Sequence, residues 1–361
     1  MRILLAGGGS GGSTAPVLAV AQELRSRKAR EFLYVGTAGG PEKELVASLG
    51  IPFRSVRTGK LRRYWSLQNL VDLVRIPMGL AEALRVVRAF QPDVAFAAGG
   101  FGAVPPLLAG NLLRVPSVIH QQDVEPGLAN RILAPFASAV TVTFPPSLGH
   151  FPRSKTALTG NPVRREILAG KREEALRIFG LRADRQTVLV TGGGTGAMGL
   201  NRLVAAAAPL LVPTCQILHI TGRGKGVDVP KLGNGYLQME FLTQEMAHAL
   251  AAADLVVSRA GLSTLTEIAA LGKASVLIPM PRSHQNANAE AFAAGDAAVV
   301  LQEGKIGPEQ LAGAILSLLS DKGRLAALAG HARALMPPQA EARIADVIER
   351  VAKRRGDGVT G

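Results

Sequence analysis

The chain has 361 residues, of which 47% are hydrophobic, enough apolar side chains to fill two domain cores. Its 41 Lys and Arg against 27 Asp and Glu give a formal charge of +14, which favours an anionic partner such as nucleotide phosphates or a lipid surface. The single Cys215 excludes an intrachain disulfide and fits a reducing compartment, and no apolar run reaches the roughly 18 residues of a membrane-spanning helix.

Short apolar runs alternate with longer helical patterns in the first half of the chain. The predicted strands cover residues 2–6, 32–35, 94–97, 117–119 and 139–142. The predicted helices cover residues 16–27, 67–89, 104–112 and 127–133. This alternation is typical of a doubly wound parallel sheet.

The same alternation restarts after Asn161 and Pro162, a pair that breaks regular structure. The predicted strands of the second half are 187–190, 216–220, 255–258 and 275–278, and its predicted helices are 200–211, 264–271, 285–294, 308–319, 323–335 and 339–353. We therefore expect an α/β protein with one domain at 1–162 and another at 163–338. The last helix, 339–355, is expected to pack back on the first domain.

Each half opens on a strand followed by a glycine-rich loop. Residues 3–12 read "ILLAGGGSGG" and residues 188–197 read "VLVTGGGTGA", which indicates an internal duplication of a nucleotide-binding fold. Gly7, Gly9 and Gly12 fit G-x-G-x-x-G, where a bare backbone lets a phosphate approach a helix start. A dinucleotide site also needs an acid after the second strand, but Gly36 and Thr37 stand there, so an NAD-dependent oxidoreductase is disfavoured.

A second constellation lies in "DLVVSRAGLSTLTEIAALG". Arg259 ends a predicted strand, residues 261–264 bring main-chain amides to a helix start, and Glu267 lies one turn into that helix. This pattern predicts a diphosphate site with a carboxylate for ribose hydroxyls. Thr264 and Glu267 also fit a capping box, which needs no ligand. The position of Arg259 at the carboxyl end of a strand favours the ligand site.

Six motifs occur along the chain in a fixed order: "GGGSGG", "HQQDVEPGLANR", "GNPVR", "GGGTGA", "SRAGLSTLTEIAALGKASVLIP" and "HQNANA". In this order they resemble the MurG family of bacterial peptidoglycan glycosyltransferases, in glycosyltransferase family 28. The resemblance implies a GT-B fold, two Rossmann-like domains facing across a cleft. It also implies an inverting transfer of N-acetylglucosamine from UDP-N-acetylglucosamine to undecaprenyl-diphosphate-MurNAc-pentapeptide (lipid I), which gives lipid II. No cofactor is implied, and without a D-x-D stretch no metal is expected.

The resemblance also assigns substrate-binding residues. It places Arg164 and Gly194 on the nucleotide, Leu242 against uracil, Leu262, Ser263, Thr264, Leu265, Thr266 and Glu267 on diphosphate and ribose, and His284, Gln285 and Asn288 on the sugar. In the first domain it places Ser10, Gly11 and Gly12 beside both substrates, and His120 to Asp123 on a polar shelf. Without the resemblance, His120 is better interpreted as a hydrogen-bonded core histidine, His284 as a solvated loop residue, and Gln285 and Asn288 as polar residues of a helix start. Arg164 or Arg259 would stabilise the charge of the leaving group.

The sequence departs from the family pattern at positions that bear on catalysis. Ser13 stands where the family has a histidine, Asp123 replaces an asparagine, and Gly194 and Thr195 replace a Ser-Gln pair. The general base is therefore open among Ser13, His120 and Asp123, because an unassisted serine is a poor base near neutral pH. Two alternatives follow: a related GT-B transferase with another lipid acceptor, and a non-catalytic protein that binds UDP-sugars or lipid.

Residues 57–90 contain seven basic and two acidic residues, together with Tyr64, Trp65 and an apolar run. This composition suits peripheral binding to an anionic membrane, which we expect at its cytoplasmic face. An ordinary surface helix with one core face remains the alternative. Nucleic acid is not an expected partner, since the basic residues are not interleaved with aromatic side chains that could stack on bases.

Overall fold

The computed structural model describes residues 1–8, 11–28, 30–40, 42–58, 67–194, 196–229 and 232–357. The chain divides into two compact units: unit 1 consists of Met1–Pro162 with Pro338–Gly361, and unit 2 of Val163–Pro337. Each unit is an α/β domain built on a parallel sheet, as the alternating pattern predicts.

Unit 1 contains a seven-stranded sheet in the order β3-β2-β1-β4-β5-β6-β7, with parallel pairing between its neighbours. Its strands are β1 (Arg2–Ala6), β2 (Glu31–Gly36), β3 (Phe53–Ser55), β4 (Val94–Ala97), β5 (Ser117–Gln121), β6 (Ala139–Val142) and β7 (Thr156–Leu158). The strand order reverses between β1 and β4. Open α/β sheets bind ligands at the carboxyl ends of the strands beside such a reversal.

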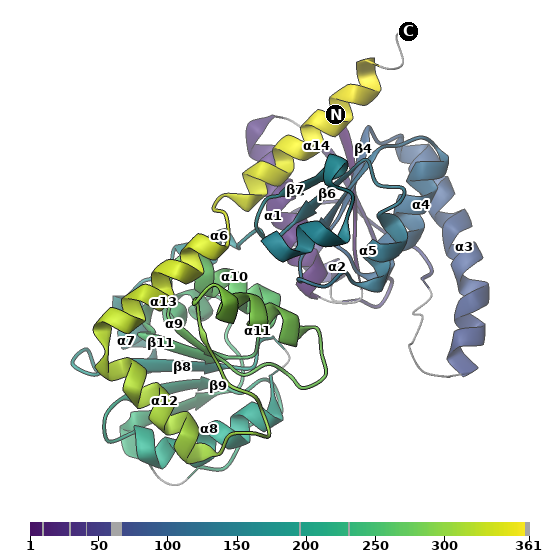
Figure 1. Cartoon of the computed structure of the whole chain (residues 1–361). Helices are drawn as coiled ribbons and strands as arrows, with labels where there is room; N and C mark the ends of the chain where they lie inside the picture. Colours follow the sequence, from purple (N-terminus) through teal and green to yellow (C-terminus); the bar gives the residue numbers. More distant parts are fainter. Residues whose placement is uncertain are drawn as a thin grey trace. The chain divides into compact units, whose positions relative to one another are not determined.

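Helices cover both faces of this sheet (Figure 1). They are α1 (Gly11–Arg27), α2 (Glu42–Ala47), α3 (Leu67–Phe90), α4 (Val104–Leu112), α5 (Leu128–Leu133) and α14 (Ala340–Asp357), with short 3-10 turns at Phe101–Ala103, Pro145–His150 and Arg153–Lys155. Ile3 and Leu5 enter the core beneath α1 and α14, whereas Leu4 and Ala6 enter the core beneath α3 and α4. Successive strand residues point to opposite faces, so β1 is apolar on both.

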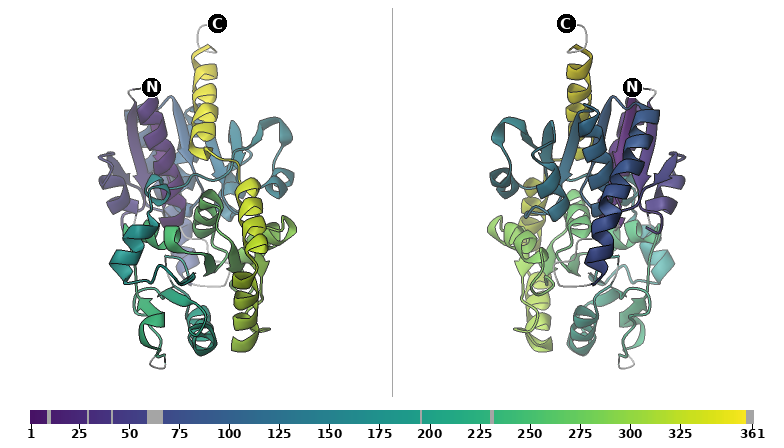
Figure 2. Two further views of the ribbon diagram at one scale, coloured as in Figure 1. Left: turned by 90° about the vertical axis from the view of Figure 1, so that its left-hand side faces the viewer. Right: turned by 90° about the vertical axis from the view of Figure 1, so that its right-hand side faces the viewer.

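Helix α14, from the end of the chain, packs beside α1 in unit 1 (Figure 2). Its buried Ile344 and Ile348 belong to the same core cluster as α1. Two ion pairs fix its outer side: Arg27 lies 2.6 Å from Asp346, and Arg30 lies 2.6 Å from a Glu349 oxygen.

Unit 2 repeats this plan on a six-stranded sheet in the order β10-β9-β8-β11-β12-β13, with parallel pairing between its neighbours. Its strands are β8 (Thr187–Thr191), β9 (Gln216–Ile220), β10 (Tyr236–Met239), β11 (Leu255–Ser258), β12 (Ser275–Leu277) and β13 (Val299–Val300). Its helices are α6 (Arg165–Leu168), α7 (Arg172–Phe179), α8 (Met198–Leu211), α9 (Glu245–Ala252), α10 (Leu262–Leu271), α11 (Gln285–Ala294), α12 (Pro308–Ser320) and α13 (Lys322–Leu335), with a 3-10 turn at Gly233–Gly235. The order reverses between β8 and β11, so the two sheets have the same topology around their glycine loops.

Two features differ from the sequence prediction. The four strands β3, β7, β10 and β13 were not predicted, and each lies at an edge of its sheet. Helix α1 begins at Gly11 and not at Pro16. The small residues before Pro16 form its first turn, and Pro16 lies inside the helix. The first turn of α1 therefore stands close to the end of β1.

Within the described ranges, no helix is both long enough and apolar enough to cross a membrane.

Candidate functional site

Two helix N-termini lie at the strand-order reversal of unit 2. Helix α8 follows β8 after the second glycine loop, and α10 follows β11 after three residues, with Gly261 as its N-cap. The first amides of each helix lack partners within that helix, and the helix dipole places partial positive charge there. Adjacent strands thus bring two anion-binding helix starts to one edge of the sheet.

The glycines of the second loop have different steric surroundings. A Cβ at Gly196 would collide with the carbonyl oxygen of Thr221, and a Cβ at Gly192 would lie 2.5 Å from the amide nitrogen of Ala197. A Cβ at Gly194 would meet no atom within 4 Å. Packing therefore requires glycine at 192 and 196, whereas Gly194 faces open space, where a ligand can approach. Thr195 lies outside the described residues.

Glu267 is a buried carboxylate on α10. Arg164, just before α6, donates to its Oε1 from Nε at 3.2 Å and from Nη2 at 2.6 Å. Burial raises the pKa of Glu267, although the positive charge and hydrogen bonds of Arg164 act in the opposite direction. In the described part of unit 2, no donor is recorded for Oε2 of Glu267, so this oxygen is available to a ligand hydroxyl.

The start of α10 contradicts the capping-box alternative. The N-cap is Gly261, which has no side chain to cap with, so Thr264 is the third residue of the helix and not its cap. Glu267 lies a further turn along and pairs with Arg164. A purely local capping role for Thr264 and Glu267 is therefore wrong.

The first turn of α10 presents some predicted contact residues and hides others. Ser263 is exposed and Thr264 is half-buried, so both can reach a bound anion. Leu265 is fully buried and its amide donates to the Gly261 carbonyl at 3.1 Å, which corrects the prediction that it contacts a ligand. Leu262 and Thr266 are also buried, and Thr266 Oγ1 donates to the Leu262 carbonyl at 2.9 Å.

The sequence predicts that Arg259 binds the donor phosphates, but in the structure its charge is buried in an ion pair. Its side chain is 8% exposed and pairs with Glu303, from Nη1 to Oε2 at 2.8 Å. Nη1 also donates to the carbonyls of Ile278 and Pro279, at 3.0 and 3.2 Å. The guanidinium is thus satisfied inside unit 2, and its predicted contact with donor phosphates is corrected.

The residues predicted to bind the sugar surround the start of α11. His284 is the exposed N-cap residue of this helix, and Gln285 Oε1 accepts from the Met280 amide at 3.0 Å. Asn288 is fully buried and donates from Nδ2 to the Ala260 carbonyl at 3.2 Å. Asn288 therefore holds the loop between β11 and α10. Leu242, predicted against uracil, is 6% exposed, so little of its side chain is open to a ligand.

In unit 1 the loops after β1 and β4 pack backbone against backbone. A Cβ at Gly100 would lie 2.6 Å from the Gly8 carbonyl oxygen and 3.0 Å from Ser13 Oγ, so Ser13 is buried against the Gly100 loop. Gly12 is exposed in the first turn of α1. Gly9 and Ser10 of the predicted phosphate loop lie outside the described residues, and the surroundings of Gly11 are likewise not described.

His120 is fully buried, which corrects its placement on a polar shelf. Its Nδ1 is hydrogen bonded to Thr141 Oγ1 at 2.9 Å and its Nε2 to Asn161 Oδ1 at 3.0 Å. Burial lowers the pKa of His120 to about 4, so the ring is neutral near pH 7. With both nitrogens engaged and no exposed surface, His120 is a hydrogen-bonded core residue and not a base in contact with substrate.

Asp123 lies half-buried in the loop after β5. Sequence reasoning missed the amides that hold this loop. Gln121 Nε2 donates to the carbonyls of Asp123 and Glu125 at 2.8 and 2.9 Å, and Asn130 Nδ2 donates to Gln121 Oε1 at 2.7 Å. Asn130 occurs in the "HQQDVEPGLANR" motif, where its burial could not be read from spacing.

Glu42 is a second residue that the sequence did not single out. Its carboxylate is fully buried at the end of β2, where Oε1 accepts from the Thr37 amide at 2.9 Å and from Thr37 Oγ1 at 2.5 Å. A Cβ at Gly8 would collide with the same oxygen. The buried carboxylate therefore holds the turn after β2 through Thr37.

Among the residues that the structure describes, no group of three His, Cys, Asp or Glu side chains is placed to hold a metal ion.

Known proteins match both units of the chain. The glycosyltransferase family 28 N-terminal domain matches residues 3–142, and the glycosyltransferase family 28 C-terminal domain matches residues 187–351. The UDP-N-acetylglucosamine–N-acetylmuramyl-(pentapeptide) pyrophosphoryl-undecaprenol N-acetylglucosamine transferase of Desulforamulus reducens is 37% identical and covers 98% of this chain and 100% of its own length. A relative of the same name from Lachnoclostridium phytofermentans is 37% identical over 87% of this chain and 89% of its own length.

The solved structures agree with these matches. The crystal structure of MurG from Acinetobacter baumannii superimposes with a TM-score of 0.77 at 26% identity, and covers 97% of this chain and 99% of the other.

Proposed function

Since the chain belongs to glycosyltransferase family 28, we propose that it transfers N-acetylglucosamine from UDP-N-acetylglucosamine to undecaprenyl-diphosphate-MurNAc-pentapeptide (lipid I) and so forms lipid II. The names of the relatives support this donor and this acceptor. The paired helix starts beside the buried Glu267 carboxylate support a nucleoside diphosphate at the carboxyl edge of unit 2. This arrangement is the observation that carries the proposal.

In the proposed reaction the acceptor hydroxyl attacks the anomeric carbon of the sugar, the bond to the diphosphate breaks, and UDP leaves with inversion. The leaving group gains negative charge as this bond breaks. Fixed amides at the starts of α8 and α10 stabilise that charge without reorganisation. Glu267 accepts hydrogen bonds from ribose hydroxyls through Oε2, while Arg164 holds its Oε1.

We assign the general base to Asp123. Ser13 is buried against the Gly100 loop and His120 is buried with both nitrogens engaged. Asp123 is half-buried, and Gln121 fixes the main chain of its loop. A carboxylate is a competent acceptor for the hydroxyl proton, and Asp123 would take over this role from the family histidine, which Ser13 replaces in this chain.

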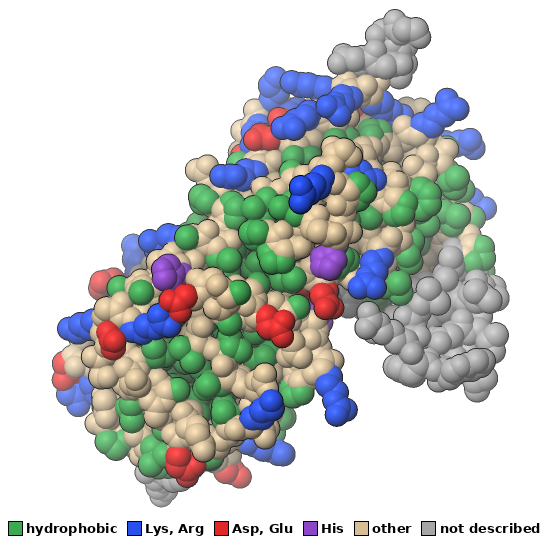
Figure 3. Space-filling view, in the orientation of Figure 1, with side chains coloured by type: hydrophobic (Ala, Val, Ile, Leu, Met, Phe, Trp, Pro, Cys, Tyr) green, Lys and Arg blue, Asp and Glu red, His purple; other side chains and the backbone are tan. Residues whose placement is uncertain are grey.

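We further propose that unit 1 binds peripherally to the anionic cytoplasmic face of the membrane. In Figure 3, Lys and Arg side chains gather over α14, whose last turn contains Arg354 and Arg355. Helices α3 and α4 add the exposed apolar residues Met78 and Leu112, the latter 62% exposed. Tyr64 and Trp65 of the predicted membrane segment lie outside the described residues. Sedimentation with phosphatidylglycerol vesicles, but not with phosphatidylcholine vesicles, is the expected result.

A transfer assay tests the proposed function. The protein is incubated with radiolabelled UDP-N-acetylglucosamine and a lipid I analogue, and label is followed into the lipid fraction. Transfer that is lost in Glu267→Gln and retained in Glu173→Gln, a control on the exposed first turn of α7, supports the proposal. Donor binding without transfer to this acceptor favours another lipid acceptor or a non-catalytic role, which the replacement of the family histidine by Ser13 leaves open. Absence of donor binding contradicts all three.

A further inference from the structure

The buried ion pair between Arg259 and Glu303 joins three strand ends of unit 2. Arg259 follows β11, and Glu303 lies three residues after β13. The guanidinium donates to the carbonyls of Ile278 and Pro279, which follow β12. It also donates to Glu303 Oε1 at 3.0 Å and lies 2.8 Å from Oε2. One side chain therefore ties the carboxyl ends of β11, β12 and β13 together.

The same carboxylate lies against the first turn of α8. A Cβ added at Gly199, the second residue of α8, would collide with Glu303 Oε1 and would lie 3.4 Å from Arg259 Nη2. The Glu303 carboxylate occupies the space that a side chain at 199 would take, so any larger residue there would displace it. A carboxylate at a helix start is stabilised by the helix dipole, and it restrains the turn that it contacts.

The pair thus connects both anion-binding helix starts. Helix α10 begins three residues after Arg259, and the start of α8 contacts Glu303. We propose that Arg259 and Glu303 are positioning residues of the nucleotide-diphosphate site: they fix the starts of α8 and α10 relative to each other and do not touch the donor. The ligand class in this proposal rests on the proposed function, whereas the restraint of the two helix starts does not.

The effect of removing the negative charge of Glu303 on donor affinity distinguishes a positioning role of Arg259 from direct phosphate binding. If Arg259 bound the donor phosphates, Glu303 would compete with them, and removing its charge would leave donor affinity unchanged or increase it. If the pair positions the helix starts, removing the charge of Glu303 loosens both turns and weakens binding. The two roles therefore predict opposite effects of Glu303→Gln.

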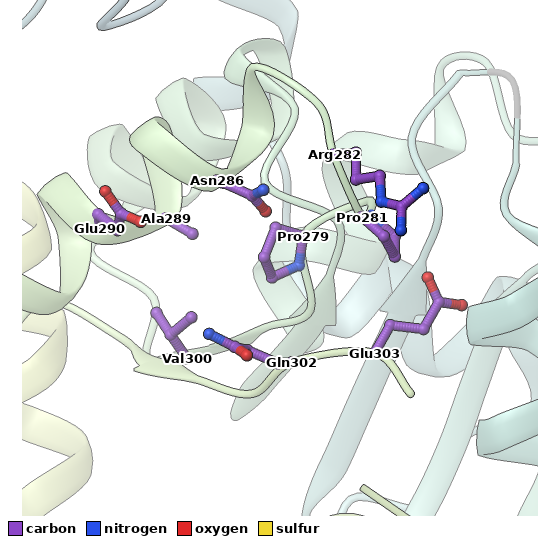
Figure 4. A pocket seen from close by; sticks show the side chains of 9 residues that line it. All are labelled: Pro279, Pro281, Arg282, Asn286, Ala289, Glu290, Val300, Gln302 and Glu303. Atoms are coloured by element: carbon purple, nitrogen blue, oxygen red, sulfur yellow. The ribbon is translucent and has the colours of Figure 1, made fainter. Parts of the chain in front are cut away.

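The surroundings of Glu303 allow this substitution without a steric change. Glu303 lines a pocket of about 230 Å³ together with Gln302, Asn286 and Glu290 (Figure 4). Its side chain is 22% exposed, compared with 8% for Arg259. Glutamine has nearly the same shape as glutamate, so it fits the same position, while it removes the charge and one of the two oxygens that accept from Arg259.

The experiment compares wild type, Glu303→Gln, Arg259→Lys and the double variant. Hydrogen exchange is measured on the ligand-free protein for amides in the first turns of α8 and α10, and UDP affinity is measured by calorimetry. We expect exchange in both turns to rise at least about tenfold in Glu303→Gln, and UDP affinity to fall about tenfold. The double variant should resemble the stronger single variant, because the two residues act as one unit. Gly199→Ala should reproduce the Glu303→Gln result.

The control removes an ion pair elsewhere in unit 2. Asp296 pairs with Arg324 at 2.6 Å with both side chains exposed, so Asp296→Asn should change neither readout. Unchanged exchange in Glu303→Gln, or tighter UDP binding, overturns the positioning role. If wild type fails to bind UDP while exchange still rises in Glu303→Gln, the proposed function fails and the positioning of the helix starts stands.

Discussion

Arg164 donates two hydrogen bonds to one oxygen of Glu267: Nε and Nη2 lie 3.2 and 2.6 Å from Oε1. The two residues are 103 positions apart in the chain. Arg164 lies near the start of unit 2, and Glu267 lies on α10 beside the proposed diphosphate site. The pairing turns Oε2 into the free acceptor of the carboxylate. It also orients the acceptor, because Oε1 is held by two hydrogen bonds.

We expect Glu267→Gln to reduce the affinity for UDP-N-acetylglucosamine about tenfold to hundredfold, since hydrogen bonds to a charged acceptor each contribute about 1.5–3 kcal/mol. Calorimetric titration with the donor measures this loss. Glu173→Gln is the matched control, because it makes the same chemical change on an exposed helix start. Equal affinity in wild type and Glu267→Gln would show that the carboxylate does not contact the donor.

Because the pKa of Glu267 is raised, the free energy of unfolding of wild type and of Glu267→Gln should depend differently on pH. Burial lets the folded protein keep the Glu267 proton to a higher pH than the unfolded chain does. The free energy of unfolding of wild type therefore falls as pH rises through the interval between the ordinary carboxyl pKa and the raised one. Glu267→Gln lacks this fall, so wild type should be most stable relative to the variant at the acid end. Urea unfolding of both proteins between pH 4 and 7 tests the sign, and parallel curves would contradict it.

His120 should make the fold sensitive to acid. Its pKa is about 4 in the folded protein, against 6.5 in the ordinary state, so the unfolded chain binds more protons between these values. The contribution of His120 to the free energy of unfolding is therefore fully present above pH 6.5. It is lost as pH falls toward 4, which lowers the free energy of unfolding by about 3 kcal/mol. The measurement is urea unfolding across this interval for wild type and His120→Gln. The variant should be less stable near neutral pH and should show a shallower acid loss.

The sequence predicted the central strands of both sheets and missed the edge strands for a physical reason. β3, β7, β10 and β13 are two to four residues long, and few of their side chains are buried. An edge strand packs against only one neighbour, so its hydrophobic pattern is weak. The central strands β1 and β8 are buried on both faces and appear in the sequence as continuous apolar runs.

In the candidate site, too, local patterns were predictable from the sequence, whereas contacts between distant side chains were not. The helix start at α10 was predicted from glycines after a strand, which is a local pattern. The ion pairs of Arg259 and Arg164 were not predictable, because their partners are distant in sequence. Arg259 pairs with Glu303, and Arg164 pairs with Glu267. For His120 the residue alone favours a buried core histidine, but its partners were not predictable, since Thr141 and Asn161 lie 21 and 41 residues away.

The base assignment predicts different results at Ser13 and Asp123. Asp123→Asn should lower kcat about a hundredfold or more, because positioned general bases typically contribute 10²- to 10⁴-fold. Ser13→Ala should retain kcat within about threefold, since its hydroxyl lies against Gly100 and would not take the acceptor proton. Single-turnover transfer rates across pH measure both effects. A large loss in Ser13→Ala with an active Asp123→Asn would reverse the assignment.

Gly194 and Gly196 form a matched pair within one loop of unit 2, and they should separate binding from folding. A Cβ at Gly196, whose φ is 67°, would collide with the Thr221 carbonyl, so Gly196→Ala should destabilise the protein by a few kcal/mol, on the order of known strained substitutions. A Cβ at Gly194 meets no atom within 4 Å, so Gly194→Ala should unfold at the wild-type midpoint. Its methyl group would instead occupy the space through which the nucleotide approaches the main chain, and UDP affinity should fall about tenfold. Thermal unfolding and UDP titration of both variants test this, and wild-type affinity in a stable Gly194→Ala would remove Gly194 from the donor site.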